Sequence, residues 1–406
     1  MNMKTVVLKF GGTSVRDEEG RSHALRHIKH AREEGYKVVV VVSAMGRKGD
    51  PYATDTLLSL ISGEAAKVSN REQDMLAACG EVISAVVFTN VLLEKGYRAS
   101  AFSGGKAGFR TTSEFKNAKI VDMNVERLLD ELALVDIVVV TGFQGVNEVG
   151  DVTTIGRGGS DTSATALGVA LKAEYVDIFT DVCGIMTADP RITDLAQPIE
   201  VLTYHEVCNM AYQGAKVIHP RAVELAMQAN VPIRIRSTYS DDKGTLVMSK
   251  KATQSLKIKE RYVTGIAHLL GISQIKLSVR ENNPYNMQAE VFNAMANAGI
   301  NIDFINIYPN GLQYTIADAD CEQAEKILAD LDYEAQVERN CAKISIVGAG
   351  ISGVPGITAK VVTPLAERGI QILQSADSHT TIWVLVKEED LSLAVDALHE
   401  VFQLFE

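Results

Sequence analysis

The sequence predicts an α/β protein in which a mainly parallel sheet is covered by helices on both faces, followed by two ferredoxin-like βαββαβ units. Apolar strand-like runs alternate with helical stretches through the first part of the chain. Several of these runs end in a polar or glycine-rich loop. Nearer the C-terminus, one order of strands and helices recurs after about seventy residues. A chain of 406 residues is also long enough for two or three domains.

Composition narrows the class of protein. A hydrophobic share of 46% and a charged share of 22% are typical of a globular protein with a large core. The formal charge of −11 disfavours a nucleic-acid-binding surface. We see no secretory leader and no apolar run near the roughly 18 residues of a membrane span. The 5 cysteines are scattered without a CxxC pair, so disulfides and structural zinc are disfavoured. We therefore expect a cytoplasmic protein without nucleic-acid, membrane or protein-held metal partners.

The first elements are indicated by residue type. Thr5–Phe10 is rich in apolar residues and predicts a strand that runs into two glycines, Gly11 and Gly12. Arg21–Glu34 has the periodicity of an amphipathic helix. Val38–Val42 consists of valines only, which is typical of a strand buried on both faces of a parallel sheet. Further strands are expected at Tyr97–Phe102, Ile137–Val140, Tyr175–Thr180 and Pro232–Arg236.

The segment Asp151–Thr165, which reads DVTTIGRGGSDTSAT, predicts a glycine-rich loop that leads from a central strand into a helix. Ser160, Asp161 and Thr162 are expected where that helix begins, beside free backbone N–H groups that favour an anion. Arg157 adds a guanidinium suited to a carboxylate or a phosphate. Taken alone, the loop also fits a capped turn with a solvated arginine.

Other polar loops are expected at the same edge of the sheet. Lys9 closes the first strand, Ser43 follows the second, and Thr180 with Asp181 ends another. Carboxyl ends of parallel strands share one edge, so these loops together predict a functional site. Phosphoryl transfer needs cations and N–H donors, and Lys9 and Lys216 are the candidate cations. Lys216 by itself also fits a surface lysine.

The C-terminal part is predicted to be a tandem repeat. Asp241–Thr253 is polar and indicates a linker, so we place a catalytic domain at 1–245, a linker at 246–262 and small units at 263–338 and 339–406. Elements of the first unit are expected at Gln274–Val279, Ala289–Ala298, Ile300–Ile307, Gln313–Ala317 and Ala324–Leu331, and those of the second at Lys343–Val347, Ala359–Arg368, Ile370–Gln374, Ile382–Val386 and Leu391–Phe402.

Common catalytic motifs are missing from the sequence. It has no GxxxxGK[ST], no HExxH, no GxSxG after a strand and no protein-kinase signature. Gly348–Gly353 is a literal GxGxxG, which as a dinucleotide fingerprint would predict an NAD enzyme. Only about fifty residues follow it, too few for a doubly wound half-domain. We interpret it as the first loop of the second small unit.

Four long motifs in order resemble those of aspartokinase. They are KFGGTS at Lys9–Ser14, VVSAMG at Val41–Gly46, GRGGSDTSA at Gly156–Ala164 and FTDVCGIMTADPR at Phe179–Arg191. The resemblance extends over essentially the whole chain, because the tandem repeat is similar to the paired ACT domains of that family. It implies the amino-acid-kinase fold, an αβα sandwich. We expect a monofunctional enzyme without a fused homoserine dehydrogenase.

The resemblance implies an aspartate kinase (EC 2.7.2.4) that transfers the γ-phosphoryl group of ATP to the β-carboxylate of L-aspartate. The product, 4-phospho-L-aspartate, would enter the pathway to lysine and diaminopimelate, threonine and methionine. Feedback regulation and homo-oligomerisation through the ACT units are implied as well. Mg²⁺ would be held mainly by the nucleotide phosphates. Alternatives are another amino acid kinase on this fold and an amino-acid sensor with an inactive kinase domain.

The resemblance also assigns roles to residues. Arg157 would hold a carboxylate of aspartate, Glu81 would lie near its ammonium group, and Asp161 would orient the lysines. Catalytic residues would be Lys9, Asp161 and Lys216. The ATP site would comprise Lys9, Phe10, Gly11, Gly12, Thr180, Asp181, Met186, Asp189, Arg191 and Lys216. The aspartate site would comprise Ser43, Thr54, Glu81, Arg157, Gly158, Gly159 and Ser160. The chain departs from the family in having Met186 where tyrosine is frequent, and in an extended RKGDPYA loop before Thr54 and Asp55.

The implied effector site lies in the ACT pair. It would comprise Ala289, Asn301, Ile302 and Asp303 of the first unit and Gln374, Ser375 and Ala376 of the second. Lysine-responsive relatives tend to carry Gln-Asn where this chain reads INIYP at Ile305–Pro309. We therefore expect diaminopimelate, as in the diaminopimelate-sensitive type, rather than lysine or threonine. Whether the two units are contiguous or exchange strands stays open, as does the oligomer size.

Overall fold

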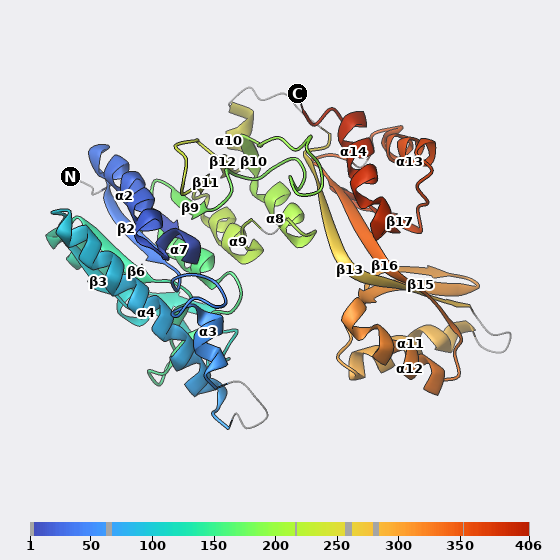
Figure 1. The fold of residues 1–406 in the computed structure, drawn as a ribbon, viewed down its shortest axis with the longest axis horizontal. Coiled ribbons are helices and arrows are strands. Elements are labelled where there is room, and N and C mark those ends of the chain that lie inside the picture. The colour runs from blue at the N-terminus through green and yellow to red at the C-terminus, as the bar shows by residue number, and fades with distance from the viewer. Residues whose placement is uncertain are drawn as a thin grey trace. The chain divides into compact units, whose positions relative to one another are not determined.

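The structure is a computed structural model that describes residues 4–61, 67–215, 217–255, 262–278, 284–351 and 353–405. It divides into two compact units (Figure 1). The first unit comprises Met1–Ile185, Pro198–Tyr212 and Lys216–Lys259, and the second comprises Met186–Gln197, Gln213–Ala215 and Glu260–Glu406. The domain boundary expected at residue 245 gave residues 186–197 and 213–215 to the catalytic domain. In the structure both segments pack with the second unit.

The first unit is built on an eight-stranded sheet in the order β10-β12-β11-β9-β1-β2-β6-β3. β1 pairs in parallel with β2 and β9, and β6 pairs in parallel with β2 and β3, as the sequence predicts. The valines of β2 are buried on both faces. The strands are β1 (Thr5–Phe10), β2 (Lys37–Val42), β3 (Ala99–Phe102), β6 (Ile137–Thr141), β9 (Val176–Thr180), β10 (Val201–Thr203), β11 (Ile233–Ser237) and β12 (Thr245–Met248).

Helices cover this sheet. α2 and α4 bury Ile28 and Phe88 in one apolar core with β-strand residues such as Val40 and Val139. On β1, α7 contacts the sheet as well. The helices are α1 (Gly12–Val15), α2 (Glu18–Glu33), α3 (Thr54–Ser59), α4 (Asn70–Glu94), α5 (Gly104–Ala107), α6 (Glu126–Leu134), α7 (Gly159–Ala170), α8 (Tyr204–Tyr212), α9 (Pro220–Ala229) and α10 (Lys250–Ser255).

A second, four-stranded sheet corrects one expectation. Its order is β5 (Ile120–Met123), β4 (Phe109–Thr111), β7 (Gln144–Val146) and β8 (Val152–Thr154). The glycine-rich loop therefore follows β8 rather than a central strand. The start of α7 nevertheless lies beside the central sheet, because the turn after β6 packs against this helix. A Cβ on Gly142 would lie 2.8 Å from Ser160 Oγ.

Two further expectations are wrong. The polar stretch expected as a linker contains β12, which pairs antiparallel with β11 and buries Val247 completely. The 25-residue helix α4 is long and apolar enough to cross a membrane by length and composition, although no such run was expected. Half of its most apolar window is buried in the protein, and Phe88 and Leu92 lie in the core. This packing is that of a core helix.

The second unit contains a six-stranded antiparallel sheet in the order β14-β15-β13-β16-β18-β17. Two βαββαβ repeats are present as predicted, although the strand expected from Ile370 begins only at Gln374. The strands are β13 (Gly265–Ser278), β14 (Asp303–Tyr308), β15 (Gly311–Ala317), β16 (Ala335–Val347), β17 (Gln374–Asp377) and β18 (Thr381–Lys387). The helices are α11 (Pro284–Asn297), α12 (Cys321–Asp330), α13 (Ile357–Glu367) and α14 (Leu391–Val401), with single 3₁₀ turns at Asp318–Asp320 and Glu388–Asp390.

The long strand β13 settles the connectivity that the sequence left open. Its second half, after Gly271, pairs with β15 and with the first half of β16. Its first half, Gly265–Leu269, pairs instead with Lys343–Val347. The fourth strand of the second repeat is thus supplied from ahead of the first repeat. The first repeat is inserted into the second, so the two are not contiguous in sequence.

The literal GxGxxG motif has a packing explanation. A Cβ on Gly348 would lie 1.8 Å from the Tyr262 carbonyl oxygen, so the backbone of residue 262 requires glycine there. This contact lies within the second unit and supports the interpretation of the motif as a loop of the second repeat.

Candidate active site

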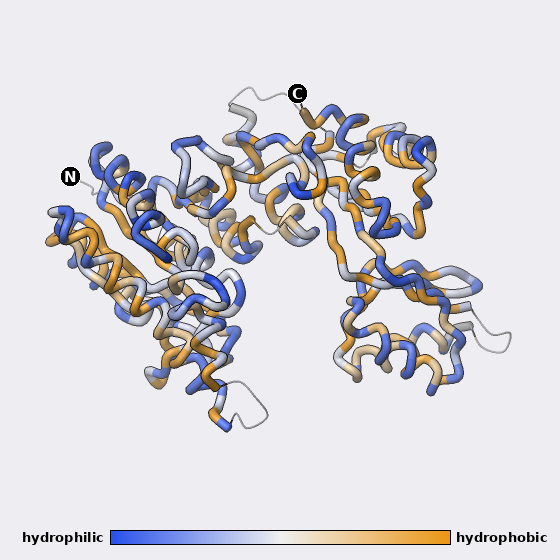
Figure 2. The backbone as a smooth tube through the Cα atoms, in the orientation of Figure 1, coloured by the Kyte–Doolittle hydropathy of each residue, from blue (hydrophilic) through white to orange (hydrophobic). Residues whose placement is uncertain are grey.

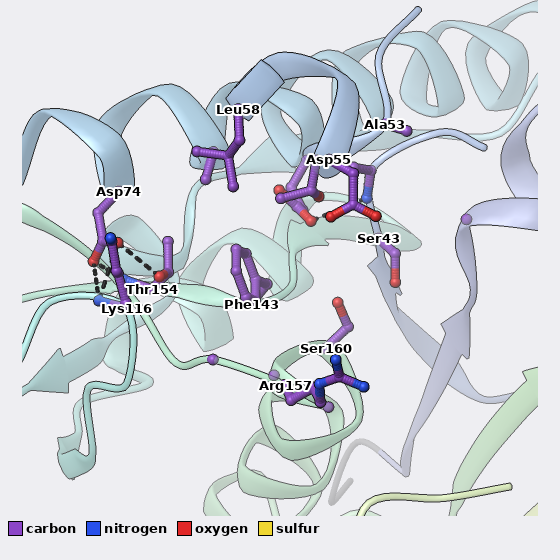
Figure 3. Close-up of a pocket in the computed structure, with 18 of the residues that line it drawn as sticks. Ser43, Ala53, Asp55, Leu58, Asp74, Lys116, Phe143, Thr154, Arg157 and Ser160 are labelled. Carbon is purple, nitrogen blue, oxygen red and sulfur yellow. Dashed lines mark hydrogen bonds between the residues drawn. The ribbon is translucent and has the colours of Figure 1, made fainter. Parts of the chain in front are cut away.

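One cavity of about 990 Å³ in the first unit gathers most of the predicted site residues. It opens at the carboxyl ends of β1 and β2 and is bounded by α3, α4 and the start of α7 (Figure 3). In Figure 3, Ser160 and Arg157 rise from the α7 end, opposite Ser43 and Asp55. The predicted residues that line it are Lys9, Gly12, Ser43, Thr54, Glu81, Arg157, Gly158, Gly159, Ser160 and Asp161.

Lys9 and Asp161 form an ion pair in this cavity. Lys9 lies near the end of β1, Asp161 lies in the first turn of α7, and Lys9 Nζ is 2.7 Å from Asp161 Oδ1. Their side chains are only 12% and 13% exposed. A Cβ on Gly11 would lie 3.7 Å from the same Nζ. The cation is therefore held at a fixed place beside the glycine turn.

The turn after β1 interlocks with the loop after β2. Gly46 N–H donates to the Gly12 carbonyl over 2.9 Å, and Ser43 N–H donates to the Phe10 carbonyl over 3.2 Å. A Cβ on Gly12 would lie only 2.5 Å from the Gly46 carbonyl oxygen. Any side chain at Gly12 would push the two loops apart. Their close fit explains why both motifs are glycine-rich.

The glycine-rich loop leads into α7 without a side-chain cap. Gly158 is the N-cap in the left-handed region, with φ of +67°, so the first-turn N–H groups have no side-chain acceptor there. Ser160 and Asp161 stand in that first turn, as expected. A Cβ on Gly158 would lie 2.2 Å from His219 Cβ, so the segment that follows Lys216 packs against this loop. Lys216 itself lies outside the described residues.

Glu81 is the most perturbed acid in the cavity. It projects from α4, is 2% exposed, and accepts a hydrogen bond at Oε1 from Ala44 N–H over 3.1 Å. Its Oε2 is buried and has no hydrogen-bond partner within the described chain. Burial raises the pKa of this carboxyl group to about 8. A cation that binds beside this oxygen would stabilise the ionised form of the carboxyl group.

Sequence reasoning missed one end of the cavity. Asp74 of α4 accepts from Lys116 N–H over 3.0 Å, from Thr154 N–H over 2.7 Å and from the Thr154 hydroxyl over 2.9 Å (Figure 3). Phe143 separates this cluster from Arg157 in the same view. Asp74 is buried and fully used in joining α4 to β8. The residues are far apart in sequence, and no motif marks them.

Four residues predicted for the nucleotide site lie around the cavity rather than among its lining: Phe10, Gly11, Thr180 and Asp181. The Phe10 ring is buried and stacks on Phe179 with centroids 4.8 Å apart, so it belongs to the core. Thr180 ends β9 and donates its hydroxyl proton to Asp181 over 3.1 Å. Asp181 also pairs with the cavity-lining Arg47 at 2.6 Å. Thr180 and Asp181 thus adjoin the site through Arg47.

Met186, Asp189 and Arg191 belong to the second unit. Asp189 accepts two hydrogen bonds from the Arg191 guanidinium, at 3.0 and 2.7 Å, which holds the pKa of Asp189 below its usual range. The adjacent Thr187 is buried and its hydroxyl lies 2.8 Å from His399 Nε2 on α14. This segment is therefore anchored on the last helix of the second repeat.

The predicted effector residues of the second unit are only partly brought together. Gln374 Nε2 donates to the Phe304 carbonyl and to Asn306 Oδ1, and Gln374 Oε1 accepts from Gln274 Nε2 over 2.8 Å. Asp303, adjacent to Phe304, pairs with Lys343 Nζ. Asp303 and Gln374 are thus neighbours across β14 and β17. Ala289, Asn301 and Ser375 are exposed, Ile302 packs at the core of the first repeat, and Ala376 packs with Phe304.

In the parts of the chain that the structure describes, no three His, Cys, Asp or Glu side chains gather closely enough to hold a metal ion. The cavity instead combines a paired lysine, a guanidinium, hydroxyls and helix N–H groups. This donor set suits anionic ligands that bring their own counter-ion.

Comparison with known proteins agrees with this chemistry. The profile of the amino acid kinase family matches residues 4–237, and that of the ACT domain matches residues 336–400. The chain is 62% identical over 403 residues to aspartokinase 1 of Bacillus subtilis. The alignment covers 99% of this chain and 100% of that relative. Two crystal structures of E. coli aspartokinase III are each 26% identical and cover 99% of this chain and 100% of theirs. The complex with aspartate and ADP has a TM-score of 0.77, and the complex with lysine and aspartate has 0.80.

Proposed function

The chain belongs to the aspartokinase family. We propose which of its residues bind each substrate and which act on the transferred phosphoryl group. The enzyme transfers the γ-phosphoryl group of ATP to the β-carboxylate of L-aspartate and gives 4-phospho-L-aspartate. This is the first step of the pathway to lysine, diaminopimelate, threonine and methionine, and the ACT domains provide feedback regulation. The activity and family that the sequence motifs predict are confirmed.

Lys9 is proposed to hold the transferring phosphoryl group. Its ammonium lies at the edge of the sheet beside Gly11 and Gly12, where phosphate oxygens can also meet backbone N–H groups. Asp161 fixes this ammonium by the 2.7 Å ion pair and acts as a positioning residue. Lys216 is proposed as a second cation. A carboxylate nucleophile is ionised at neutral pH, so no general base is required.

Aspartate is proposed to bind between the two walls of the cavity. Arg157 would take one carboxylate by its guanidinium, and the unpartnered Oε2 of Glu81 would take the ammonium group. Hydroxyls from Ser43, Thr54 and Ser160 and the backbone of Gly158 and Gly159 would complete the contacts. The observation that carries this assignment is the gathering of Lys9, Glu81 and Arg157 around one cavity.

ATP is proposed to lie beside the strand ends, in contact with Phe10 through its backbone, Gly11, Gly12, Thr180 and Asp181. Met186, Asp189 and Arg191 are proposed to contact the nucleotide as well. Mg²⁺ fits this site only as a companion of the nucleotide, since the described residues offer no cluster of protein ligands. When bound, the ion would neutralise charge on the phosphates. We further propose that the enzyme acts in the cytoplasm.

Replacement of Arg157 by Ala tests the aspartate site. A coupled ADP-release assay should give a KM for aspartate raised by about a hundredfold, since a bidentate charged contact contributes about 3 kcal/mol. The KM for ATP should stay within about twofold. The exposed Arg110 of β4 offers a matched control, Arg110→Ala, with unchanged constants. A rise in the KM for ATP alone would assign Arg157 to the nucleotide instead.

The regulatory effector is proposed to be diaminopimelate, bound in the ACT pair, which is also proposed to join copies of the chain. The E. coli complex with lysine shows that a relative binds an amino acid. In this chain Asp303 and Gln374 would bind the effector, together with Ala289, Asn301, Ile302, Ser375 and Ala376. Ligand binding stabilises by mass action, so a thermal-shift series with lysine, threonine, methionine and diaminopimelate discriminates the candidates. A larger shift with lysine or threonine would refute diaminopimelate.

A further inference from the structure

The RKGDPYA loop, residues 47–53, brings two cations to the active-site cavity. Arg47 and Lys48 are both exposed and both border the cavity, as does Ala53 at the end of the loop. The loop is hydrophilic, in contrast to the valine strand β2 that lies ahead of it (Figure 2). Both substrates proposed for this cavity carry negative charge, so the two cations lie beside ligands of opposite sign.

Hydrogen bonds hold the start of this loop in a fixed position. Arg47 N–H donates to Asp50 Oδ2 over 2.7 Å, and Asp50 N–H donates to the Arg47 carbonyl over 2.8 Å. Gly46 has a φ of +88° and lies so close that a Cβ there would clash with the Asp50 carboxylate. Further along, Gly49 N–H donates to Thr56 Oγ1 of α3 over 3.1 Å. The Arg47 side chain therefore projects from a defined backbone position.

The side chain of Arg47 reaches across the end of β1. Gly46 N–H donates to the Gly12 carbonyl, so the Arg47 backbone lies beside the glycine turn after β1. Arg47 Nη2 lies 2.6 Å from Asp181 Oδ2, just past the end of β9. In the sheet, β1 lies between β2 and β9. A side chain that joins the loop after β2 to the end of β9 therefore passes the carboxyl end of β1.

The carboxyl end of β1 is also the place proposed for the transferring phosphoryl group. Lys9 is the last residue but one of β1, and a Cβ on Gly11 would lie 3.8 Å from the Phe179 carbonyl oxygen of β9. The glycine turn, the end of β9 and the Arg47 guanidinium thus share one small region. Among the described residues, this guanidinium forms one ion pair, through Nη2. A guanidinium has five N–H donors, so it can bind a phosphate oxygen and still keep Asp181.

We propose that Arg47 binds a γ-phosphate oxygen of ATP through the N–H groups that Asp181 leaves free. This inference rests on the proposed position of the nucleotide at the end of β1. The ion pair also explains how Asp181 can border a nucleotide, because a carboxylate beside phosphates is unfavourable unless a cation neutralises it. The side chains of Arg47 and Asp181 are 68% and 47% exposed, so the pair itself adds little stability and the guanidinium can adjust to its ligand.

Titration calorimetry on the full-length chain, with Mg²⁺ and without aspartate, tests the contact. Arg47→Ala should weaken the binding of ATP about tenfold and that of ADP less than twofold, because only ATP has the terminal phosphate. Arg47→Lys should weaken ATP only about threefold, since lysine keeps the charge but loses the planar fork. Lys48→Ala, from the same loop, is the matched control, and both of its dissociation constants should stay within about twofold of wild type.

Three results would overturn the contact with the γ-phosphate. They are unchanged ATP binding in Arg47→Ala, an equal loss for ATP and ADP in that variant, and an equal loss of ATP binding in Lys48→Ala. Lys9→Ala distinguishes this failure from a failure of the nucleotide position. If Lys9→Ala weakens ATP and Arg47→Ala does not, the Arg47 contact alone is wrong. If neither variant weakens ATP, the proposed position of the nucleotide at the end of β1 is wrong as well.

Discussion

Each unit of the molecule contains a buried or half-buried lysine paired with an aspartate, and the two pairs differ in a telling way. Lys9 and Asp161 are both largely buried, with side chains 12% and 13% exposed. In the second unit, Lys343 is 7% exposed whereas the side chain of Asp303 is 59% exposed. The first pair is enclosed on both sides. The second presents one carboxylate to solvent and keeps only its cation inside.

The difference follows from where the residues lie. Lys9 is on a central strand and Asp161 is in the first turn of a buried helix, so both partners are fixed by the core. Lys343 is on the inner strand β16, whereas Asp303 begins the edge strand β14. An enclosed pair suits a phosphoryl group that must be held without reorganisation. A solvent-exposed carboxylate suits an effector that binds and dissociates reversibly.

The largest expected effect is at the enclosed pair. Lys9→Ala should lower kcat by about a thousandfold, because it removes a preorganised cation from developing phosphoryl charge. The KM for aspartate should change far less. The matched control is Lys343→Ala, whose kcat without effector should stay within about twofold of wild type. Steady-state kinetics of both variants decide the comparison. Equal losses of kcat would mean that the two pairs do not differ in role.

The next effect concerns Glu81 and pH. With a pKa of about 8 in the free enzyme, this carboxyl group is mostly protonated at pH 7 and mostly ionised at pH 9. Because the ammonium group of aspartate prefers the ionised form, kcat/KM for aspartate should rise about tenfold over that range. Glu81→Gln should have a low, flat profile. A rise of the same size in Glu81→Gln would assign it to another group.

The same group makes a stability prediction with a definite sign. Its folded-state pKa of about 8 exceeds the ordinary carboxyl value of about 4.3, so the folded protein holds a proton that the unfolded chain releases. The free energy of unfolding should therefore fall as pH rises from about 4 to 8. Glu81→Gln lacks this loss, and thermal melts at pH 9 should show it more stable than wild type. The buried carboxyl group of Glu81 thus costs stability at high pH.

The smallest expected effect is at the open pair. Asp303→Asn should weaken effector binding by about threefold, because an exposed charge is screened by solvent. Basal kcat should not change. Titration of the thermal shift with diaminopimelate measures this, and Ser375→Ala on β17, next to Gln374, provides a milder comparison. A change in basal kcat without effector would place Asp303 in the catalytic cycle.

Much of the catalytic unit was predictable because its signals are local. The valines of β2 predict a strand buried on both faces, and the glycines beside Lys9 and Arg157 predict tight turns. Both features depend on neighbouring residues, which is why the motifs indicate the cavity correctly. The same reasoning placed the glycine-rich loop after a central strand, whereas it follows β8. Strands β7 and β8 are so short that the sequence pattern does not reveal them.

Other features arise from contacts between residues far apart in sequence. Asp74 meets Thr154 across 80 positions, and Thr187 meets His399 across 212. Neither pair has a spacing or composition that marks it. The division between the two units also depends on contacts between distant residues. Residues 186–197 belong to the second unit, where Thr187 is hydrogen-bonded to β13 and to His399 of α14.

The sequence by itself determined the parallel sheet, the tandem repeat, the family and the chemistry of the main loops, because periodicity and turn chemistry are written within a few residues. Only the tertiary structure decided that the first repeat is inserted into the second, that Glu81 is buried without a partner at Oε2 among the described residues, and that Arg47 meets Asp181 across the end of β1. These outcomes depend on which distant surfaces meet, and burial is a property of the packed chain rather than of any segment.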